Sequence, residues 1–166
     1  MPNFSSLKFL AILLLFGSLA SNLSAQVVHK FSGKVYSYGD PCDDVKVELK
    51  QAGEVVYTEV TKGNGKFTLE VQAESEYMLS LSKEGLKSKT IWINTKQTEK
   101  LAQQPPNFKF DVGLKKDKRS KYDELYEIPV ALIKYDRKKQ AFYMDDTYGD
   151  LLDRKKKRLR ENAPRR

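Results

Sequence analysis

The sequence predicts a mainly β fold: a seven-stranded Greek-key β-sandwich that is followed by a C-terminal hairpin and a short basic helix. Two observations lead to this prediction. Between residues 31 and 114, apolar side chains recur at every second position within short segments, which is the pattern of half-buried strands. Turns rich in Gly, Asn, Asp and Pro separate these segments, at the spacing of about 8 to 12 residues that is typical of sandwiches.

The strands are expected at residues 31–37, 45–50, 55–60, 67–71, 77–82, 88–95 and 108–114. The segment 55–60 is assigned as a strand because it is rich in β-forming residues, and the other six because their apolar and polar residues alternate. The inward rows are expected to form the core, and they comprise Val35, Val45, Val47, Leu49, Phe67, Leu69, Val71, Tyr77, Leu79, Leu81, Ile91, Ile93, Phe108, Phe110 and Val112. Burying such side chains stabilises the fold by about 1.5–3 kcal/mol each, which is enough to drive folding without crosslinks.

The segment from Thr61 to Lys66 is expected to be a hairpin turn. Gly63 and Gly65 permit a positive φ, and Asn64 tolerates one. Phe67 then starts a strand that is directed into the core.

A second hairpin is expected at residues 128–135 and 140–144, after a charged linker that begins at Lys115. Two strands alone are marginally stable in water, so this hairpin should dock on the body. Trp92 is the expected docking position, because it points away from the row of Ile91 and Ile93 and lies near Tyr36 if their strands are neighbours. The alternative is that Trp92 and Tyr36 form an exposed anchor for a partner.

The last segment, 145–162, is expected to be a basic amphipathic helix. Asp145 or Asp146 can cap its start, and its basic residues come late, which suits the helix dipole. Tyr148, Leu151, Leu152 and Leu159 are expected near one face. Four interpretations remain open: a solvated terminal helix, docking to an acidic protein surface, peripheral contact with anionic lipid or cell-wall carboxylates, and, least favoured, nucleic-acid binding. The candidate partner-binding residues are Tyr36, Trp92, Lys155, Lys156, Lys157, Arg158 and Arg160.

The N-terminal residues 1–25 have the order of a secretory signal peptide: one Lys, an apolar run and then small residues. The domain organisation is therefore a signal peptide at 1–25, a β-sandwich domain at 26–115 and a C-terminal extension at 116–166. Cys42 is the sole cysteine, so no internal disulfide forms, and an unpaired thiol in an exported protein is expected to be buried.

Charge is spread unevenly along the chain. Residues 26–114 contain twelve basic and twelve acidic side chains, whereas residues 115–166 contain seventeen and ten. The body is therefore neutral and the extension basic, so the net charge of +8 does not describe a basic sandwich.

Three segments of the body carry a family resemblance. Residues 33–47 contain a Gly-Lys-Val strand, a Gly-Asp-Pro loop and a second strand, residues 61–71 contain a small-residue turn before an aromatic-led strand, and residues 77–86 end on Gly85 and Leu86. Together they resemble the carboxypeptidase regulatory-like domain, a transthyretin-like (prealbumin-like) sandwich. The likeness covers residues 31 to about 95, with 108–114 as a final strand. It implies a non-catalytic module of the kind found at the front of outer-membrane proteins in Bacteroidota-type bacteria.

The sequence contains none of the common catalytic patterns, and the chain is expected not to be an enzyme. There is one His, His29, which is placed ahead of the first strand, and neither a Gly-rich phosphate loop before a helix nor a nucleophile elbow is present. Asp40, Asp43 and Asp44 lie beside a Pro and are interpreted as turn formers rather than calcium ligands. No cofactor or metal is predicted.

Two functional hypotheses follow from these observations. The first is an accessory or scaffold subunit that binds another envelope protein, located in the periplasm or on the periplasmic face of the outer membrane rather than at the cell surface. The second is an extracellular module that binds a glycan or a peptide. The sequence indicates neither the identity of the partner nor an oligomeric state.

Overall fold

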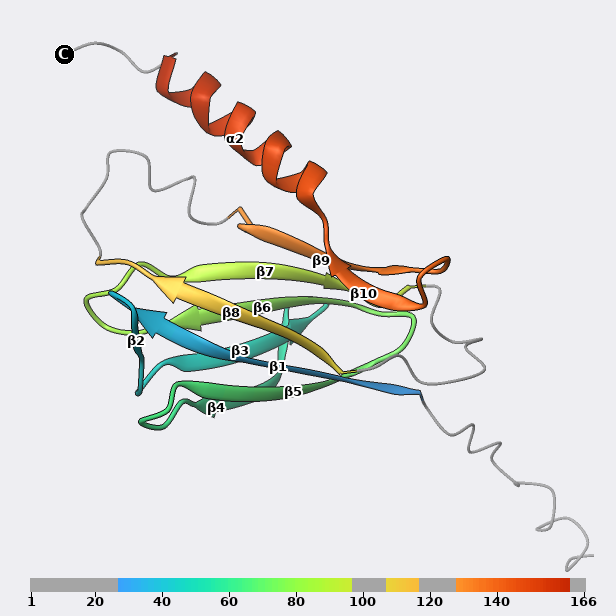
Figure 1. The fold of residues 1–166 in the computed structure, drawn as a ribbon, viewed down its shortest axis with the longest axis horizontal. Helices are drawn as coiled ribbons and strands as arrows, with labels where there is room; N and C mark the ends of the chain where they lie inside the picture. The colour runs from blue at the N-terminus through green and yellow to red at the C-terminus, as the bar shows by residue number, and fades with distance from the viewer. Residues whose placement is uncertain (1–26, 97–106, 117–127, 162–166) are drawn as a thin grey trace, which may run out of the picture.

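The computed structural model describes residues 27–96, 107–116 and 128–161. These residues form two β-sheets and one helix (Figure 1), so the prediction of a mainly β fold with a C-terminal helix is confirmed. The elements are β1 (Val28–Ser37), β2 (Asp40–Pro41), β3 (Lys46–Gln51), β4 (Glu54–Val60), β5 (Lys66–Gln72), β6 (Glu76–Ser82), β7 (Lys89–Asn94), β8 (Phe108–Leu114), β9 (Ala131–Asp136), β10 (Ala141–Met144) and α2 (Asp146–Glu161).

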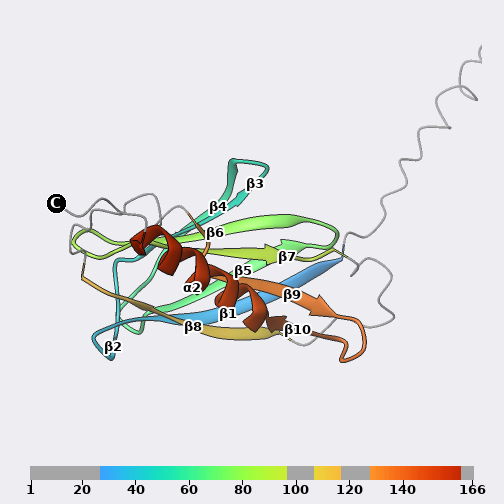
Figure 2. The same ribbon diagram turned by 90° about the horizontal axis from the view of Figure 1, so that it is seen from above.

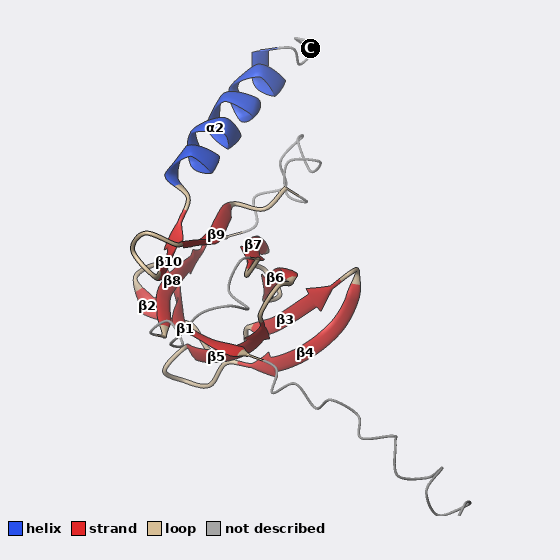
Figure 3. Ribbon diagram, turned by 90° about the vertical axis from the view of Figure 1, so that its right-hand side faces the viewer, coloured by secondary structure: helices blue, strands red, loops and turns tan. Residues whose placement is uncertain are grey.

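The first sheet has four strands and is built around β1. That strand pairs antiparallel with β2 and β5 and parallel with β8. The second sheet has six strands in the order β10-β9-β7-β6-β3-β4, with β9 parallel to β7 and every other pair antiparallel. Figure 3 shows the two sheets facing one another, with β4 at the outer edge of the second sheet.

The structure adds two features that the sequence does not predict. The two-residue strand β2 closes a tight turn at Tyr38 and Gly39, and this adds an eighth strand to the body. The C-terminal hairpin extends the second sheet through β9, where Ile91, Trp92 and Ile93 pair with residues 131–133. The sequence could not indicate this parallel pairing, because the two strands are far apart along the chain.

The core lies between the sheets and follows the predicted inward rows. Every predicted core residue is buried except Phe108, which is half-buried and packs against the core. The burial expected for Cys42 is also confirmed. The structure adds further residues to the core that the predicted rows leave out, among them Phe31, Leu114, Ile133 and Phe142. Two of these come from the hairpin, so the hairpin contributes to the same core as the body.

The two sheets are joined differently along their two sides. On the side of β10, the ring of Phe142 lies 4.8 Å from that of Phe31 and 6.4 Å from that of Phe108. On the side of β4, the contact is polar, because the N–H of Thr68 in β5 donates to Oε1 of Glu59 at 3.0 Å. Aromatic packing therefore joins the two sheets at the hairpin, and a hydrogen bond to the Glu59 carboxylate joins β5 to β4 on the other side.

The placement of His29 ahead of the first strand is wrong. β1 begins at Val28, and His29 is buried within it with its ring edge-on to Phe142 at 5.2 Å. Burial lowers the pKa of His29, which favours the neutral imidazole. The alternating pattern predicts that the first strand starts at Phe31, because histidine is not counted among the apolar residues that define the pattern.

The interpretation of residues 61–66 as a hairpin turn is also wrong. β4 belongs to the second sheet and β5 to the first, so this segment crosses between the sheets. Of its two glycines, Gly65 has a positive φ of 66° and Gly63 does not. The carbonyl of Gly65 accepts a hydrogen bond from the N–H of Val35 at 2.8 Å, which holds the crossing against β1.

Several predictions concern residues outside the described ranges. These are the signal peptide at 1–25 and the linker residues from 117 to 127. In the part of the chain that the structure describes, no helix is both long and apolar enough to cross a membrane.

Candidate functional site

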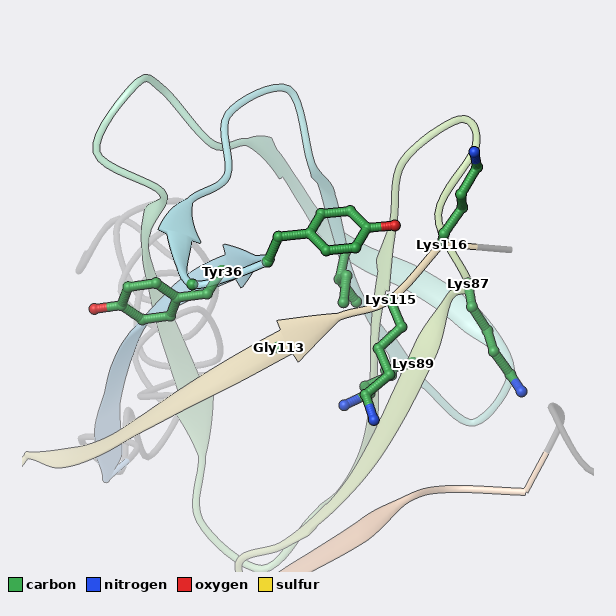
Figure 4. Close-up of a pocket in the computed structure, with 9 residues that line it drawn as sticks. Tyr36, Lys87, Lys89, Gly113, Lys115 and Lys116 are labelled. Atoms are coloured by element: carbon green, nitrogen blue, oxygen red, sulfur yellow. The ribbon is translucent and has the colours of Figure 1, made fainter. Parts of the chain in front are cut away.

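A hollow of about 710 Å³ lies at the end of the sandwich where β1 and β8 finish and β7 begins (Figure 4). Its volume is within the range of about 300–1,000 Å³ that small-molecule sites occupy. We call it the lysine pocket, and its lining residues are Tyr36, Tyr38, Gly39, Lys87, Lys89, Gly113, Leu114, Lys115 and Lys116.

Backbone pairing brings these residues together from distant parts of the chain. β1 and β8 are parallel, so they end side by side, with Tyr36 paired to Gly113. After β8, the chain crosses to the segment before β7, where the N–H of Lys87 donates to the carbonyl of Lys115 at 2.8 Å. Leu86 and Lys116 form an isolated bridge at the same place. The walls of the pocket are therefore tied by main-chain bonds that link the two sheets.

The pocket has a positive electrostatic character. Four of its lining residues are lysines and none is acidic. Lys87 and Lys89 are half-buried, whereas Lys115 and Lys116 are exposed. In Figure 4, the side chains of Lys89 and Lys115 extend to the same part of the pocket, while those of Lys87 and Lys116 diverge. Clustered ammonium groups raise the local concentration of anions, so the pocket is suited to a ligand with several separated negative charges.

Trp92 lines a second hollow, of about 450 Å³, on the outer face of the second sheet. Its other lining residues are Lys50, Ala52, Gly53, Glu76, Tyr77, Met78, Pro129 and Tyr148. Trp92 is half-buried, beside Met78 in β6 and Leu132 in β9. The hairpin therefore lies next to Trp92, as the sequence predicts. Tyr36 belongs to the other sheet, so β1 and β7 are not neighbours and the condition under which Tyr36 would lie near Trp92 is not met.

The start of α2 is held to the hairpin by polar contacts and one buried side chain. Asp145 caps the helix, because the backbone N–H of Thr147 donates to its Oδ1 at 3.1 Å. The other oxygen of Asp145 lies 2.6 Å from Nζ of Lys134. Tyr148 donates its hydroxyl hydrogen to the carbonyl of Pro129 at 2.8 Å, and Leu152 is buried.

The rest of α2 projects away from the sandwich (Figures 1 and 3), so in the view from above it lies in front of the sheets (Figure 2). Of the predicted binding residues, Lys155, Lys157 and Arg158 are exposed, and Lys156 and Arg160 are helical but their side chains lie outside the described part. Leu151 is 60% exposed whereas Leu152 is buried, so of these two leucines near one face of the helix only Leu152 packs against the rest of the protein. Adjacent helix positions point in different directions, and Leu152 takes the inner one.

The exposed edge of β4 was not among the predicted binding residues. Val55, Val56 and Val60 are 50%, 51% and 54% exposed, and Tyr57 is 39% exposed. Among the described strands, β4 is the last strand of the second sheet and pairs with β3 alone. The pattern of residues 55–60 supplied a signal, since β-forming residues occur there without the strict alternation of the other strands.

Acidic groups surround Tyr57 on this edge. Its hydroxyl donates to Oε2 of Glu59 at 3.1 Å. Burial, followed by the carboxylates of Glu59 and Glu70, raises the pKa of Tyr57. The edge of β4 thus combines exposed valines with the carboxylates of Glu59 and Glu70 near Tyr57.

Within residues 27–96, 107–116 and 128–161, no group of three or more His, Cys, Asp or Glu side chains is arranged to hold a metal ion. Asp43 pairs with Lys83 at 3.0 Å, and Asp44 has a positive φ of 49°. Asp44 thus lies in a bend, which agrees with its interpretation as a turn former, whereas Asp43 serves an ion pair.

No protein-family model matches the chain, and no curated protein matches it. The solved structures that match include 3-chlorocatechol 1,2-dioxygenase from Rhodococcus opacus 1CP, with 17% identity and a TM-score of 0.40 over 58% of this chain and 62% of that one. Catechol 1,2-dioxygenase from Acinetobacter radioresistens has 14% identity and a TM-score of 0.44 over 60% and 55%. The TIE protein of Bacillus anthracis has 14% identity and a TM-score of 0.43 over 54% and 18%.

These matches correct one prediction. The sequence excludes an enzyme, and the comparison contradicts that exclusion because the similar structures include dioxygenases. The matched region spans less than two thirds of each of the three proteins named above. Because the identities and TM-scores are low, no reaction, catalytic residue or cofactor of these proteins is assigned to this chain.

Proposed function

We propose that this protein is an exported accessory or scaffold subunit of a bacterial cell envelope, and that it binds another envelope protein along the edge of β4. The signal-peptide pattern of residues 1–25 supports export to the periplasm or to the periplasmic face of the outer membrane. The resemblance of residues 31–95 to the carboxypeptidase regulatory-like domain, with its transthyretin-like Greek-key sandwich, supports a partner-binding role.

The exposed apolar edge of β4 carries this proposal. Among the described strands, β4 pairs with β3 alone, so the N–H and C=O groups along its other side are open to a further strand. Natural proteins commonly protect such an edge with Lys or Pro, and β4 contains neither. An added strand of a partner would complete the hydrogen bonds and cover Val55, Val56 and Val60.

The chemistry of the edge limits the partner in two ways. The acidic residues Glu54, Glu59 and Glu70 favour an extended segment in which Lys or Arg alternates with apolar residues. The register of β3 and β4 shifts between Leu49 and Lys50, and a bulge of this kind increases the local twist. A partner strand must follow that twist, which disfavours indiscriminate pairing.

Site-specific crosslinking in living cells tests this proposal. A photoreactive amino acid at Thr58, an exposed position in β4, is expected to capture one envelope protein. The double variant Val56→Lys/Val60→Lys is expected to abolish the crosslink. The two new positive charges repel a basic partner strand, and they occupy positions where the partner would bury apolar groups. Substitutions at exposed positions typically change stability by about 0.5 kcal/mol or less, so the melting temperature should stay nearly constant.

The control variant introduces a lysine on α2 instead of on β4. Leu151→Lys alters an exposed leucine of the helix and is expected to leave the Thr58 crosslink intact. A photoreactive group at position 151 tests whether the partner binds at α2 rather than at the edge of β4. If it captures the partner while Thr58 does not, or if the crosslink survives the double β4 variant, the partner binds elsewhere and the proposal is overturned.

A further inference from the structure

We propose that the lysine pocket binds an acidic oligosaccharide whose sugar units carry carboxylate groups. The inference does not depend on the partner at β4, because the pocket lies at the end of the sandwich where β1 and β8 finish (Figure 4). It rests on three features of the described residues: the distribution of the lysines, the chemistry of the remaining walls and the backbone of Tyr38.

The lysines favour an extended polyanion over a compact one. Their side chains point in different directions, with those of Lys89 and Lys115 extending to one part of the pocket and that of Lys116 pointing away from them (Figure 4). Compact phosphate groups are typically held by Arg forks or by helix N-termini, and neither lines this pocket. A chain of uronic acid units presents one carboxylate per ring, so its charges are spaced along its length.

The other walls suit the apolar faces of sugar rings. They comprise the rings of Tyr36 and Tyr38, the open backbone of Gly113 and the aliphatic stems of the lysines. Aromatic side chains combine a broad apolar face with a polar tip, and binding sites commonly pair such surfaces with a few charged groups. At Gly113, no atom lies within 4 Å of the position that a Cβ would take, so a ligand ring can approach the strand closely there.

Tyr38 supplies an independent reason to expect a ligand. It is 75% exposed, so it is not retained for packing. Its φ is 55° and that of Gly39 is 97°, in a two-residue turn where Asn or Gly is favoured at the first position. A bulky residue with positive φ is strained, and strain of this kind is concentrated at functional sites. Tyr38 lines the pocket, so its exposed side chain is available there for contact with a bound molecule.

The test is a binding titration of the full exported chain with oligogalacturonate of six units at low salt. Maltohexaose serves as the neutral saccharide, inorganic phosphate as the compact anion and a poly-glutamate peptide as the acidic polypeptide. Oligogalacturonate alone is expected to bind, with an affinity that falls as salt rises. Tyr38→Asn is expected to weaken binding at least tenfold while the melting temperature stays the same or rises, because Asn relieves the turn.

Two lysine variants complete the experiment. Lys115→Gln is expected to weaken binding severalfold and to reduce its salt dependence, because one charge of the pocket is lost. Lys109→Gln removes an exposed lysine of β8 outside the pocket and should leave the affinity unchanged. The proposal is overturned if oligogalacturonate does not bind, if poly-glutamate or phosphate binds equally well, or if Tyr38→Asn and Lys109→Gln have the same effect.

Discussion

At the scale of single residues, the crossing between the two sheets depends on Gly65. Its φ is 66°, and a Cβ at this position would lie 2.5 Å from the carbonyl oxygen of Val35 and 3.0 Å from the amide nitrogen of Cys42. The same carbonyl of Val35 accepts a hydrogen bond from Cys42. Neither backbone group can move without disturbing β1, so no side chain larger than hydrogen fits.

We therefore expect Gly65→Ala to lower the free energy of unfolding by roughly 2–4 kcal/mol, because left-handed backbone strain and a main-chain clash add together. Chemical denaturation of the purified protein measures this loss. Gly63→Ala is the matched control, since no atom lies within 4 Å of its Cβ position and its φ is not positive. Equal losses for the two variants would contradict the role assigned to Gly65.

At the scale of elements, α2 is attached through the carboxylate of Asp145. Hydrogen bonding to Lys134, followed by hydrogen bonding to Thr147, lowers the pKa of Asp145 to about 2. A carboxyl group whose pKa is lowered on folding stabilises the folded state above its unfolded pKa of 3.8. This stabilisation is lost as the pH falls through the folded value of about 2.

Asp145→Asn is accordingly expected to lower the stability at neutral pH by about 1–2 kcal/mol. The difference from the natural chain should shrink between pH 4 and pH 2, because protonation of Asp145 then weakens the same contacts. Melting temperatures of both proteins across this range measure it. As a control, Lys157→Gln removes the exposed 3.9 Å ion pair between Lys157 and Glu161, and it should change the melting temperature little. A pH-independent effect of Asp145→Asn would rule out this linkage.

At the scale of the whole molecule, the body and the C-terminal hairpin share one core. Phe142 is 6% exposed and its ring meets those of His29, Phe31 and Tyr135 at 5.2, 4.8 and 5.4 Å. Ile133 is fully buried and pairs with Ile93. The hairpin therefore forms the side of the sandwich at which β10 faces β8.

Phe142→Ala is expected to destabilise the whole protein by about 3–5 kcal/mol and to lower a single melting transition by roughly 10 °C or more. Calorimetry of the full chain checks this. Tyr143→Ala changes the neighbouring, 38% exposed residue of β10 and should shift the transition much less. An unchanged main transition in Phe142→Ala, with a separate weak one, would mean that the hairpin folds on its own.

The candidate sites were only partly predictable from the sequence. Tyr36 and Trp92 were predicted as binding candidates because aromatic residues on outward strand positions are locally recognisable. The lysine pocket was not predicted, because Lys87 and Lys115 meet through one long-range hydrogen bond. The exposure of β4 was also missed, although residues 55–60 lack the strict alternation of the other strands, because a β-rich composition alone does not distinguish an edge strand from a central one.

The sequence by itself determined which side chains face the core. Alternation with a period of two is a local property, and nearly every predicted inward residue is buried. The tertiary structure alone decided the order of the strands and hence the sites. Lys34 and Asp111, 77 positions apart, are joined by a hydrogen bond, and such pairings are selected by global packing rather than by any local pattern. The pocket lysines and the open edge of β4 are consequences of that packing.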